Sequence, residues 1–429
     1  MNQYKDVLER EDPRVSELFN VEADTIDSGS ILIEDPFPAL NRLREEAPVH
    51  KGALGDLMGY EGYHFTNHLE GFPTYSAFTF AAVSKGLIDN KTFSSKAYYH
   101  LGTVAGLGES ILNKSGADHR MIRGPIQPFF SPAEAQSWWN EKVIVETVET
   151  LIAKIEKKSS ADLFLELCAR MPVHVVSAGF GFDPDDIIPF RIALTQLNRH
   201  GIPVEQRAAA METVRGMLGR LITERRSRPQ NDIITKLVTA EVKEPDGSVR
   251  GFTDDEIIGN CTLIVLAGGG TTWRQLGITL FALLENPDQM QLFRENRALA
   301  PEVILESARW HPTDLIFPRL VEEDAELEGV ALPKGAMLHL CLGSANRDPR
   351  RWDNPDAFDI TRPVQRSLAF GGGPHSCLGQ HVSRQEMVVA MDAVFDRLPN
   401  VRWDPDKPKG RLIGDLFARG PSALPVVFG

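Results

Sequence analysis

The chain has 429 residues and is acidic, with 46 Lys and Arg against 59 Asp and Glu and a formal net charge of −13. This charge and the lack of a basic block argue against a protein that binds nucleic acid or an anionic membrane surface. Hydrophobic residues make up 42% of the sequence, which is enough for a large core and excludes a disordered chain.

No run approaches the ~18 consecutive apolar residues of a membrane span, so we expect no membrane anchor. The polar start, residues 1–14, has no apolar segment before a cleavage site, and we therefore expect no signal peptide and a cytoplasmic location. The four cysteines lie far apart without a Cys-x-x-Cys pair, which argues against a zinc site and a disulfide framework.

The first part of the chain is expected to contain much loop. Residues 1–35 are polar and loop-like, a short helix is predicted over 38–46, and the Gly-, Ser- and Asn-rich stretch 91–116 predicts a long loop. Residues 132–228 have overwhelmingly helical spacing. Breaks are predicted at Pro172, Asp183–Pro184 and Pro203.

The clearest single element is a long helix. Thr253 and Glu256 form a capping box ahead of apolar residues at helical spacing, and Pro287 forbids continuation beyond Asn286. The helix should have roughly 32 residues and span about 48 Å. A helix of that length, apolar on most faces, is expected to cross the whole domain.

The remaining elements complete a mainly α fold with a minor β region. A helix is predicted over 301–310, short strands over 315–345, a Gly-rich loop at 370–376, a helix over 377–398 and a closing hairpin over 412–428. No linker suggests a second domain.

The strongest chemical signal is the segment 370–379, Phe-Gly-Gly-Gly-Pro-His-Ser-Cys-Leu-Gly. Consecutive glycines let a backbone pass close to a flat ligand. Cys377 is placed at a predicted helix N-terminus, where free amides favour a thiolate, and such a thiolate can bind a haem iron. A lone buried cysteine beside a flexible turn is the alternative interpretation of this residue taken by itself.

The segment resembles the haem-binding loop of the cytochrome P450 family, Phe-x-x-Gly-x-x-x-Cys-x-Gly, whose fixed positions are met by Phe370, Gly373, Cys377 and Gly379. The similarity extends over nearly the whole chain. It implies a cytochrome P450 fold in residues 1–429, one haem domain without a fused reductase, with the long helix over haem b and Cys377 binding the iron from below. The resemblance implies these cofactor contacts: His119, Arg123, Ala267, Gly268, Arg319, Phe370, Gly371, His375, Cys377 and Gly379.

Two of these contacts, His119 and Arg123, match the family's His-x-x-x-Arg, which binds haem propionates; a polar helix face is the alternative. Pro125 stands where the family usually has an apolar residue, so we expect this helix to end early. Glu306 and Arg309 match the Glu-x-x-Arg signature. With Arg362 they are expected to form a buried structural cluster, although alone the motif is usually a solvated ion pair.

Residues 267–272, Ala-Gly-Gly-Gly-Thr-Thr, lie inside the long helix, where each glycine costs roughly 1 kcal/mol. Close helix packing is one explanation, and a local opening of the helix beside the iron is the other. The family pattern places Thr271 as the oxygen-binding threonine and Gly270 at the position of a proton-relaying acid. Without that acid, water, a neighbouring carboxyl or the hydroxyl of Thr272 must deliver protons.

The resemblance implies a monooxygenase that inserts one atom of O2 into a hydrophobic small molecule. Electrons would come from a separate ferredoxin-type donor with its reductase. Arg120, Arg366 and Arg384 are candidate contacts for this donor, and the alternative is that they are ordinary surface arginines. Gly270 motivates an alternative function, a peroxide-driven or redox-neutral enzyme, and a non-catalytic ligand-binding or sensor protein is a third.

The resemblance also implies which residues form the walls of the substrate pocket, although any apolar core would supply similar residues. They are Tyr98, Tyr99, His100, Leu101, Val104, Leu263, Leu266, Ala267, Leu315, Ile316, Phe317, Leu416 and Phe417.

Overall fold

The computed structural model describes residues 19–60, 71–101, 108–198 and 203–429, and its centre is the 32-residue helix α17 (Asp254–Glu285). Both hydrogen bonds of the predicted capping box are present: the Glu256 amide donates to Thr253 Oγ1 over 3.2 Å, and the Thr253 amide donates to Glu256 Oε2 over 2.9 Å. The helix ends at Glu285, just before Pro287. The prediction of this helix and of both its ends is confirmed.

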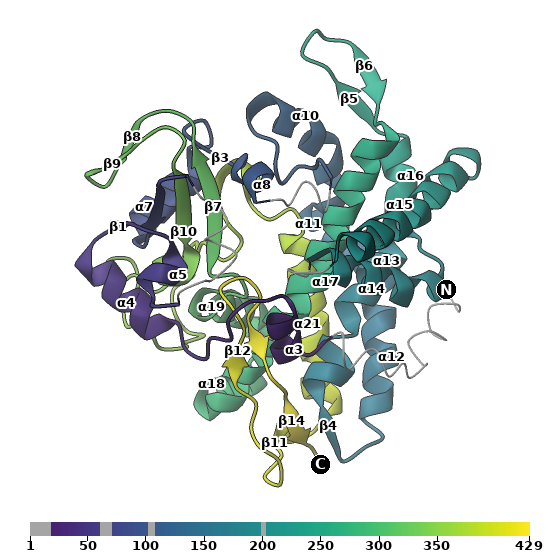
Figure 1. Ribbon diagram of the computed structural model, residues 1–429. Coiled ribbons are helices and arrows are strands. Elements are labelled where there is room, and N and C mark those ends of the chain that lie inside the picture. The colour runs from purple at the N-terminus through teal and green to yellow at the C-terminus, as the bar shows by residue number, and fades with distance from the viewer. Residues whose placement is uncertain (1–18, 61–70, 102–107, 199–202) are drawn as a thin grey trace.

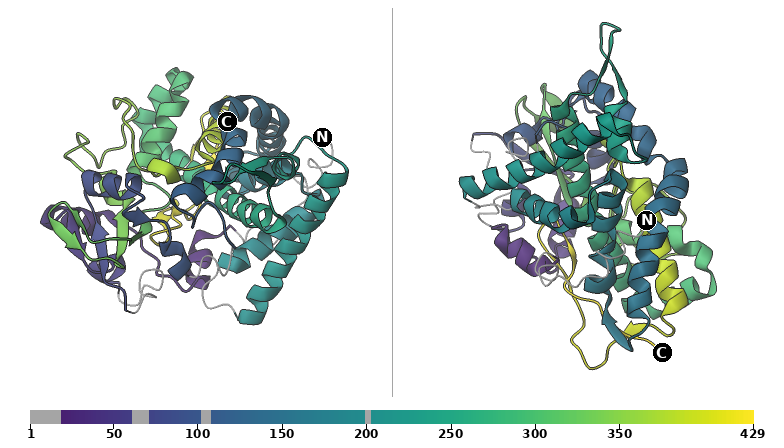
Figure 2. Two further views of the ribbon diagram at one scale, coloured as in Figure 1. Left: turned by 90° about the horizontal axis from the view of Figure 1, so that it is seen from above. Right: turned by 90° about the vertical axis from the view of Figure 1, so that its right-hand side faces the viewer.

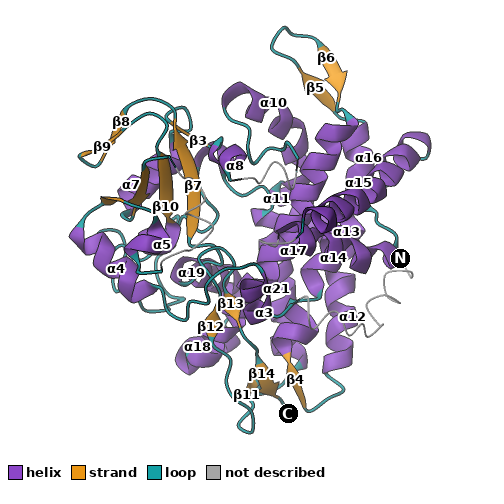
Figure 3. Cartoon of the chain, viewed as in Figure 1, coloured by secondary structure: helices purple, strands orange, loops and turns teal. Residues whose placement is uncertain are grey.

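Helices form most of the molecule, and a small β region lies to one side of them (Figures 1 and 3). The sequence predicted this mainly α fold with a minor β region. The helices besides α17 are α3 (Val21–Asp27), α4 (Phe37–Glu46), α5 (Leu54–Leu57), α7 (Phe80–Ile88), α8 (Ala97–His100), α10 (Gly116–Ile126), α11 (Pro132–Glu134), α12 (Val145–Ile155), α13 (Met171–Phe180), α14 (Ile187–Asn198), α15 (Val204–Ser227), α16 (Ile233–Val238), α18 (Pro287–Glu295), α19 (Ala300–Trp310), α20 (Leu342–Ala345) and α21 (Gln380–Arg397). None of the described helices is both long and apolar enough to cross a membrane.

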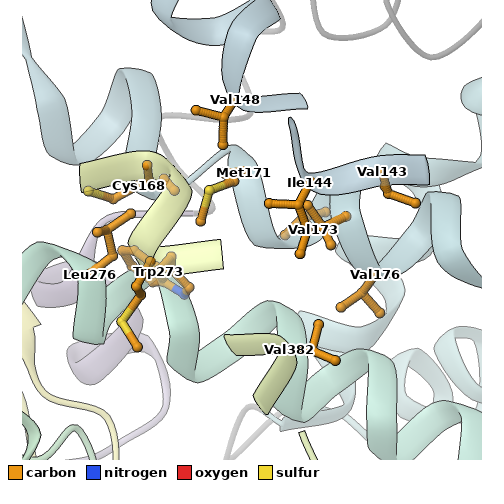
Figure 4. Close-up of a cluster of buried hydrophobic side chains, with 14 of the residues drawn as sticks. Val143, Ile144, Val148, Cys168, Met171, Val173, Val176, Trp273, Leu276 and Val382 are labelled. Atoms are coloured by element: carbon orange, nitrogen blue, oxygen red, sulfur yellow. The ribbon is translucent and has the colours of Figure 1, made fainter. Parts of the chain in front are cut away.

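One buried hydrophobic cluster surrounds α17 and takes in side chains from Phe19 to Phe428. Trp273 of α17 is fully buried and lies edge-on to Phe19, with 5.3 Å between the ring centroids. Figure 4 shows part of this cluster, where Trp273 and Leu276 lie among residues of neighbouring helices. Burial of apolar area on all sides holds α17 in place as the scaffold for the residues it carries.

The β region contains a five-stranded sheet in the order β1-β2-β10-β7-β3, in which β10 is parallel to β2 and antiparallel to β7. Residues 311–315 connect α19 to β7. The strands are β1 (Val49–Lys51), β2 (Thr74–Ala77), β3 (Phe93–Ser94), β4 (Ser160–Asp162), β5 (Glu241–Lys243), β6 (Val249–Gly251), β7 (Ile316–Val321), β8 (Ala325–Leu327), β9 (Val330–Leu332), β10 (Met337–Cys341), β11 (Arg402–Trp403), β12 (Leu412–Ile413), β13 (Gly420–Pro421) and β14 (Pro425–Val427).

A three-stranded sheet in the order β11-β14-β4 and the two-stranded pairs β5–β6, β8–β9 and β12–β13 complete the described β structure. The hairpin β5–β6 projects from the helical body (Figure 2), whereas β12–β13 packs against α17. The predicted closing hairpin over 412–428 is therefore only partly correct, because β14 leaves β13 and pairs with β11 and β4. The short strand β4 also lies within the stretch 132–228 that was predicted to be overwhelmingly helical.

Four further predictions need correction. Helix α3 forms within the predicted N-terminal loop, and β3 and α8 form within the predicted loop 91–116. Helix α10 continues through Pro125 to Ile126 and passes directly into a 3₁₀ turn, so it does not end early. Helix α21 begins at Gln380 rather than at Cys377. The polar start, residues 1–14, lies outside the described residues.

Candidate functional site

A cavity of about 600 Å³ lies beside the middle of α17, and residues from segments far apart in the chain line it. The Gly-rich loop before α21 forms one wall and α17 forms a second. Further lining residues come from α8, β7, the loop between β12 and β13, and the helices α3, α10, α13, α14, α15 and α21. The side chains of Thr271 and Cys377 line this one cavity, although they come from different elements. Other lining residues that the sequence singled out are Tyr98, Leu101, Arg123, Leu263, Leu266, Ala267, Gly268, Gly270, Thr272, Phe317, Arg319, Phe370, Gly371, His375, Gly379 and Phe417.

The loop that presents Cys377 depends on its glycines. Gly373 has a φ of +64°, and a Cβ atom there would lie 2.5 Å from the carbonyl oxygen of Leu87, so no larger residue fits without moving the backbone. The Cys377 amide donates to the carbonyl of Phe370 over 2.8 Å and closes the loop. The structure therefore accounts for Gly373 by a close backbone contact.

The Cys377 side chain is exposed toward the cavity while protein surrounds it on its other sides. Burial raises the pKa of its thiol, and the backbone amide of Gly379 and the guanidinium of Arg123 act in the opposite direction. Cys377 stands just before the first turn of α21, so amides at the start of that helix face the sulfur, as predicted from the helix N-terminus.

Cationic and imidazole side chains gather at one end of the cavity. The rings of His119 and His375 lie 4.1 Å apart, and His119 Nδ1 and Nε2, His375 Nε2 and Arg319 Nε are buried without a hydrogen-bond partner among the described residues. Burial, reinforced by Arg123, lowers the pKa of His119 to about 4, and burial with His119 nearby lowers the pKa of His375 to about 2. Such a group of unsatisfied donors suits the carboxylates of a bound anion.

Arg123 connects this group of donors to the Cys377 loop. Its Nη2 donates to the carbonyl of Ser376 over 2.6 Å and its Nε donates to Gln127 Oε1 over 3.0 Å. The side chain is 9% exposed and lines the cavity, so the continuation of α10 through Pro125 leaves Arg123 directed at the site.

The buried cluster expected from the resemblance is present and confirmed. Glu306 Oε2 accepts from Arg309 Nε over 2.7 Å, and Glu306 Oε1 accepts from Arg362 Nε over 3.2 Å. Arg309 also donates to the carbonyls of Asn346 and Pro355. The cluster therefore fastens α19 to the chain that leads into the Cys377 loop, and its role is structural.

The three glycines of α17 have different environments. A Cβ atom on Gly268 would lie 2.8 Å from Val176 Cγ2, and one on Gly269 would lie 3.2 Å from Arg191 Nη1, so close packing explains these two. A Cβ atom on Gly270 would meet nothing within 4 Å. Helix α17 stays continuous through these residues, so the predicted local opening of the helix is wrong, and the space beside Gly270 comes from the missing side chain.

The two threonines after Gly270 make different hydrogen bonds. Thr271 Oγ1 donates to the carbonyl of Ala267 over 3.0 Å, while Thr272 Oγ1 donates to Ser383 Oγ of α21 over 3.1 Å. Glu386, one turn beyond Ser383, is buried and also lines the cavity. Burial raises the pKa of the Glu386 carboxyl well above its ordinary value and so favours its protonated form. The sequence reasoning missed Glu386 because a glutamate inside a helix carries no signal of burial.

The predicted substrate walls are partly correct. Leu315, Ile316 and Leu416 pack in a separate hydrophobic cluster instead of lining the cavity, whereas their neighbours Asp314, Phe317, Asp415 and Phe417 line it. Tyr99 and His100 are also absent from the lining among the described residues, and Val104 lies outside those residues. The sequence reasoning missed the charged lining residues Asp24, Arg191, Arg207, Arg274, Asp314 and Asp415.

Comparison with known proteins decides the family. The cytochrome P450 family model matches residues 188–412, just over half of the chain. Cytochrome P450 105C1 from Streptomyces sp is 32% identical over 281 residues, which cover 65% of this chain and 72% of that protein. The chain belongs to the cytochrome P450 family.

Solved P450 structures share the fold. CYP109E1 from Bacillus megaterium in complex with corticosterone superposes with a TM-score of 0.77 at 26% identity, covering 92% of this chain and 98% of that one. P450BioI in complex with acyl carrier protein carrying hexadec-9Z-enoic acid gives a TM-score of 0.77 at 25% identity, covering 92% and 99%. The predicted mainly helical P450 fold is thereby confirmed, and the protein is an oxidoreductase of this monooxygenase family.

Haem is the cofactor of P450 enzymes, and the residues of this cavity fit it. Arg319 and His375 line the cavity with polar atoms that lack a partner among the described residues, and they suit propionate carboxylates; His119 contacts the His375 ring. Cys377 presents a sulfur to the same cavity. Gly371 lines the cavity without a side chain, and Gly373 lets the loop pack closely against the backbone of Leu87 and Ile88.

We expect Arg123→Leu to lose haem roughly tenfold faster than the wild type, because a charge-assisted donor to a carboxylate is removed. Arg120→Leu is the matched control, since Arg120 lies on the same helix and is exposed. Transfer of haem to an apo-globin acceptor measures the rate. Equal rates for the two variants would contradict a role of Arg123 in holding the cofactor.

Proposed function

We propose that this P450 inserts one oxygen atom from O2 into a hydrophobic small molecule, with electrons from a separate redox partner. One observation carries the proposal: the sulfur of Cys377 and the hydroxyl of Thr271 line the same largely apolar cavity. The relatives with bound steroid and fatty acyl chain bind largely apolar molecules, which supports a hydrophobic substrate here.

The cofactor, when bound through Cys377, supplies the oxygen-inserting chemistry. The chain provides its surroundings: Leu263, Leu266 and Phe317 exclude water and hold an apolar substrate. Thr271 Oγ1 holds a proton that it now donates to the Ala267 carbonyl, and rotation about χ1 directs it elsewhere in the cavity. Glu386 lies on the α21 side, one turn beyond the Ser383 that accepts from Thr272, and burial favours the protonated form of its carboxyl.

We further propose that residues 1–429 act as one haem domain, since one hydrophobic cluster includes side chains from Phe19 to Phe428. Electrons would then come from a ferredoxin-type donor with its reductase. Arg120 and Arg366 are exposed and Arg384 is half-buried, so they remain the proposed docking contacts. The cytoplasmic location expected from the sequence stays a prediction.

Replacing Thr271 by valine tests the proposed reaction. We expect several-fold less product per electron consumed and more hydrogen peroxide, because the hydroxyl that can donate a proton in the cavity is lost. Thr262→Val is the matched control, since Thr262 makes the same hydrogen bond to the carbonyl four residues earlier but does not line the cavity. Unchanged coupling in Thr271→Val would contradict the assignment.

The open space beside Gly270 favours a second candidate function, oxidation driven by hydrogen peroxide. It predicts product from substrate and hydrogen peroxide alone, at a rate equal to that with O2 and a complete electron supply. Negligible product under the first condition removes this candidate.

A further inference from the structure

Asp314 is a carboxyl group that faces the cavity and lacks a partner. It lies between α19 and β7, is surrounded by protein, and lines the same cavity as Thr271 and Cys377. Among the described residues, no hydrogen bond or ion pair to its side chain is recorded. A carboxylate in such surroundings is costly unless something donates to it.

The backbone on both sides of Asp314 is fixed. The Thr313 amide and hydroxyl both donate to Gln275 Oε1 of α17 over 3.2 Å, and the Thr313 carbonyl accepts from the Arg419 amide over 3.0 Å. The Leu315 amide donates to the Leu416 carbonyl over 2.8 Å. Asp314 is thereby held with its side chain toward the cavity while Leu315 is fully buried on the opposite side.

The nearby charged groups are already engaged. Asp415 Oδ1 accepts from the amides of Phe417 and Ala418 over 2.7 and 2.9 Å. Arg274 donates to the Gly270 carbonyl over 2.6 Å and forms an ion pair with Asp24 of α3. A cavity ligand can therefore donate a hydrogen bond to Asp314 without displacing a contact that its side chain already makes with the described residues.

Electrostatics agree with this geometry. Burial raises the pKa of Asp314 to about 7, Arg274 acts to lower it, and the neighbouring carboxyl of Asp415 raises it further. A cation in the cavity would interact favourably with both carboxyls and restore the ionised form of Asp314. A neutral apolar ligand would leave the group unsatisfied.

We propose that Asp314 binds a protonated amine of the substrate, so that the enzyme acts on basic molecules that are otherwise apolar. This rests on the proposed function and narrows its substrate class. The apolar body would pack against Leu263, Ala267 and Phe317 while the ammonium donates to Asp314. Asp314 is then a specificity-determining residue that orients the substrate from a fixed point beside β7.

The test uses the haem-loaded protein and a series of phenylalkyl dimethylamines of increasing linker length. Each amine is paired with the hydrocarbon in which CH replaces nitrogen and with the corresponding alcohol. Titration calorimetry and the change in haem absorption both report binding. We expect the best amine to bind at least about tenfold more tightly than its hydrocarbon and its alcohol, and this preference to vanish in Asp314→Asn and return in Asp314→Glu.

Several outcomes overturn the proposal: equal affinity for amine and hydrocarbon, an alcohol that binds as tightly as the amine, a preference that persists in Asp314→Asn, or no binding by any amine of the series. Failure of the proposed function is separate, because a hydrocarbon that binds and is oxygenated would support the monooxygenase while refuting the amine contact. Haem content and circular dichroism of Asp314→Asn establish that the variant is folded and loaded.

Discussion

Replacing Cys377 by histidine should reduce product formation to the background of the assay. The sulfur of Cys377 faces the cavity beside the amides that begin α21, and the thiolate is the group that gives a P450 haem its reactivity. A neutral imidazole supplies much less electron density to the metal. The fold should survive, because the Cys377 side chain faces the cavity and the loop is closed by its backbone hydrogen bond to Phe370.

Cys261→Ala is the control for this experiment. Cys261 lies on α17, is fully buried and does not line the cavity, so its removal should lower stability slightly without altering the spectrum or the turnover. Product formation is measured with a complete electron supply, and haem content is determined for each variant. Wild-type turnover by Cys377→His with full haem content would refute the assignment of the ligand.

Glu306→Ala should have the largest effect on stability. Its carboxylate accepts from both Arg309 and Arg362, and the Arg309 side chain is only 1% exposed. Removing Glu306 leaves buried guanidinium charge without its counter-ion, which costs about 3–5 kcal/mol. The free energy of unfolding from denaturant titration is the measurement, and we expect reduced haem retention as a consequence.

Glu46→Ala provides a matched control, because Glu46 pairs with Arg42 over 2.8 Å but both side chains are about half exposed. Such a surface pair is worth about 0.2–1 kcal/mol. If Glu306→Ala and Glu46→Ala lowered the free energy of unfolding by the same amount, the buried cluster around Glu306 would not stabilise the fold as proposed.

Local signals in the sequence were sufficient for several elements. The capping box of Thr253 and Glu256 and the stop at Pro287 determined α17 to within a residue at each end, since both signals act through neighbouring backbone groups. The Cys377 loop was likewise apparent from its glycines. The cluster of Glu306, Arg309 and Arg362 required the family resemblance, because its members meet only in the folded chain.

Other features depend on contacts that no local pattern encodes. Strand β4 forms because β14, from the other end of the chain, pairs with it. Helix α3 places Asp24 in an ion pair with Arg274 of α17. The polar N-terminal sequence gives no local signal of this contact. Asp314 directly precedes the apolar residues 315–317, but no pattern in the sequence shows that its side chain lines the cavity while Leu315 and Ile316 are buried elsewhere.

The absorption spectrum of the purified wild-type protein, reduced and treated with carbon monoxide, tests the central claim most directly. The account predicts bound haem with the spectrum of thiolate ligation. A protein that takes up no haem after reconstitution, or that shows the spectrum of a histidine-bound haem, would contradict it.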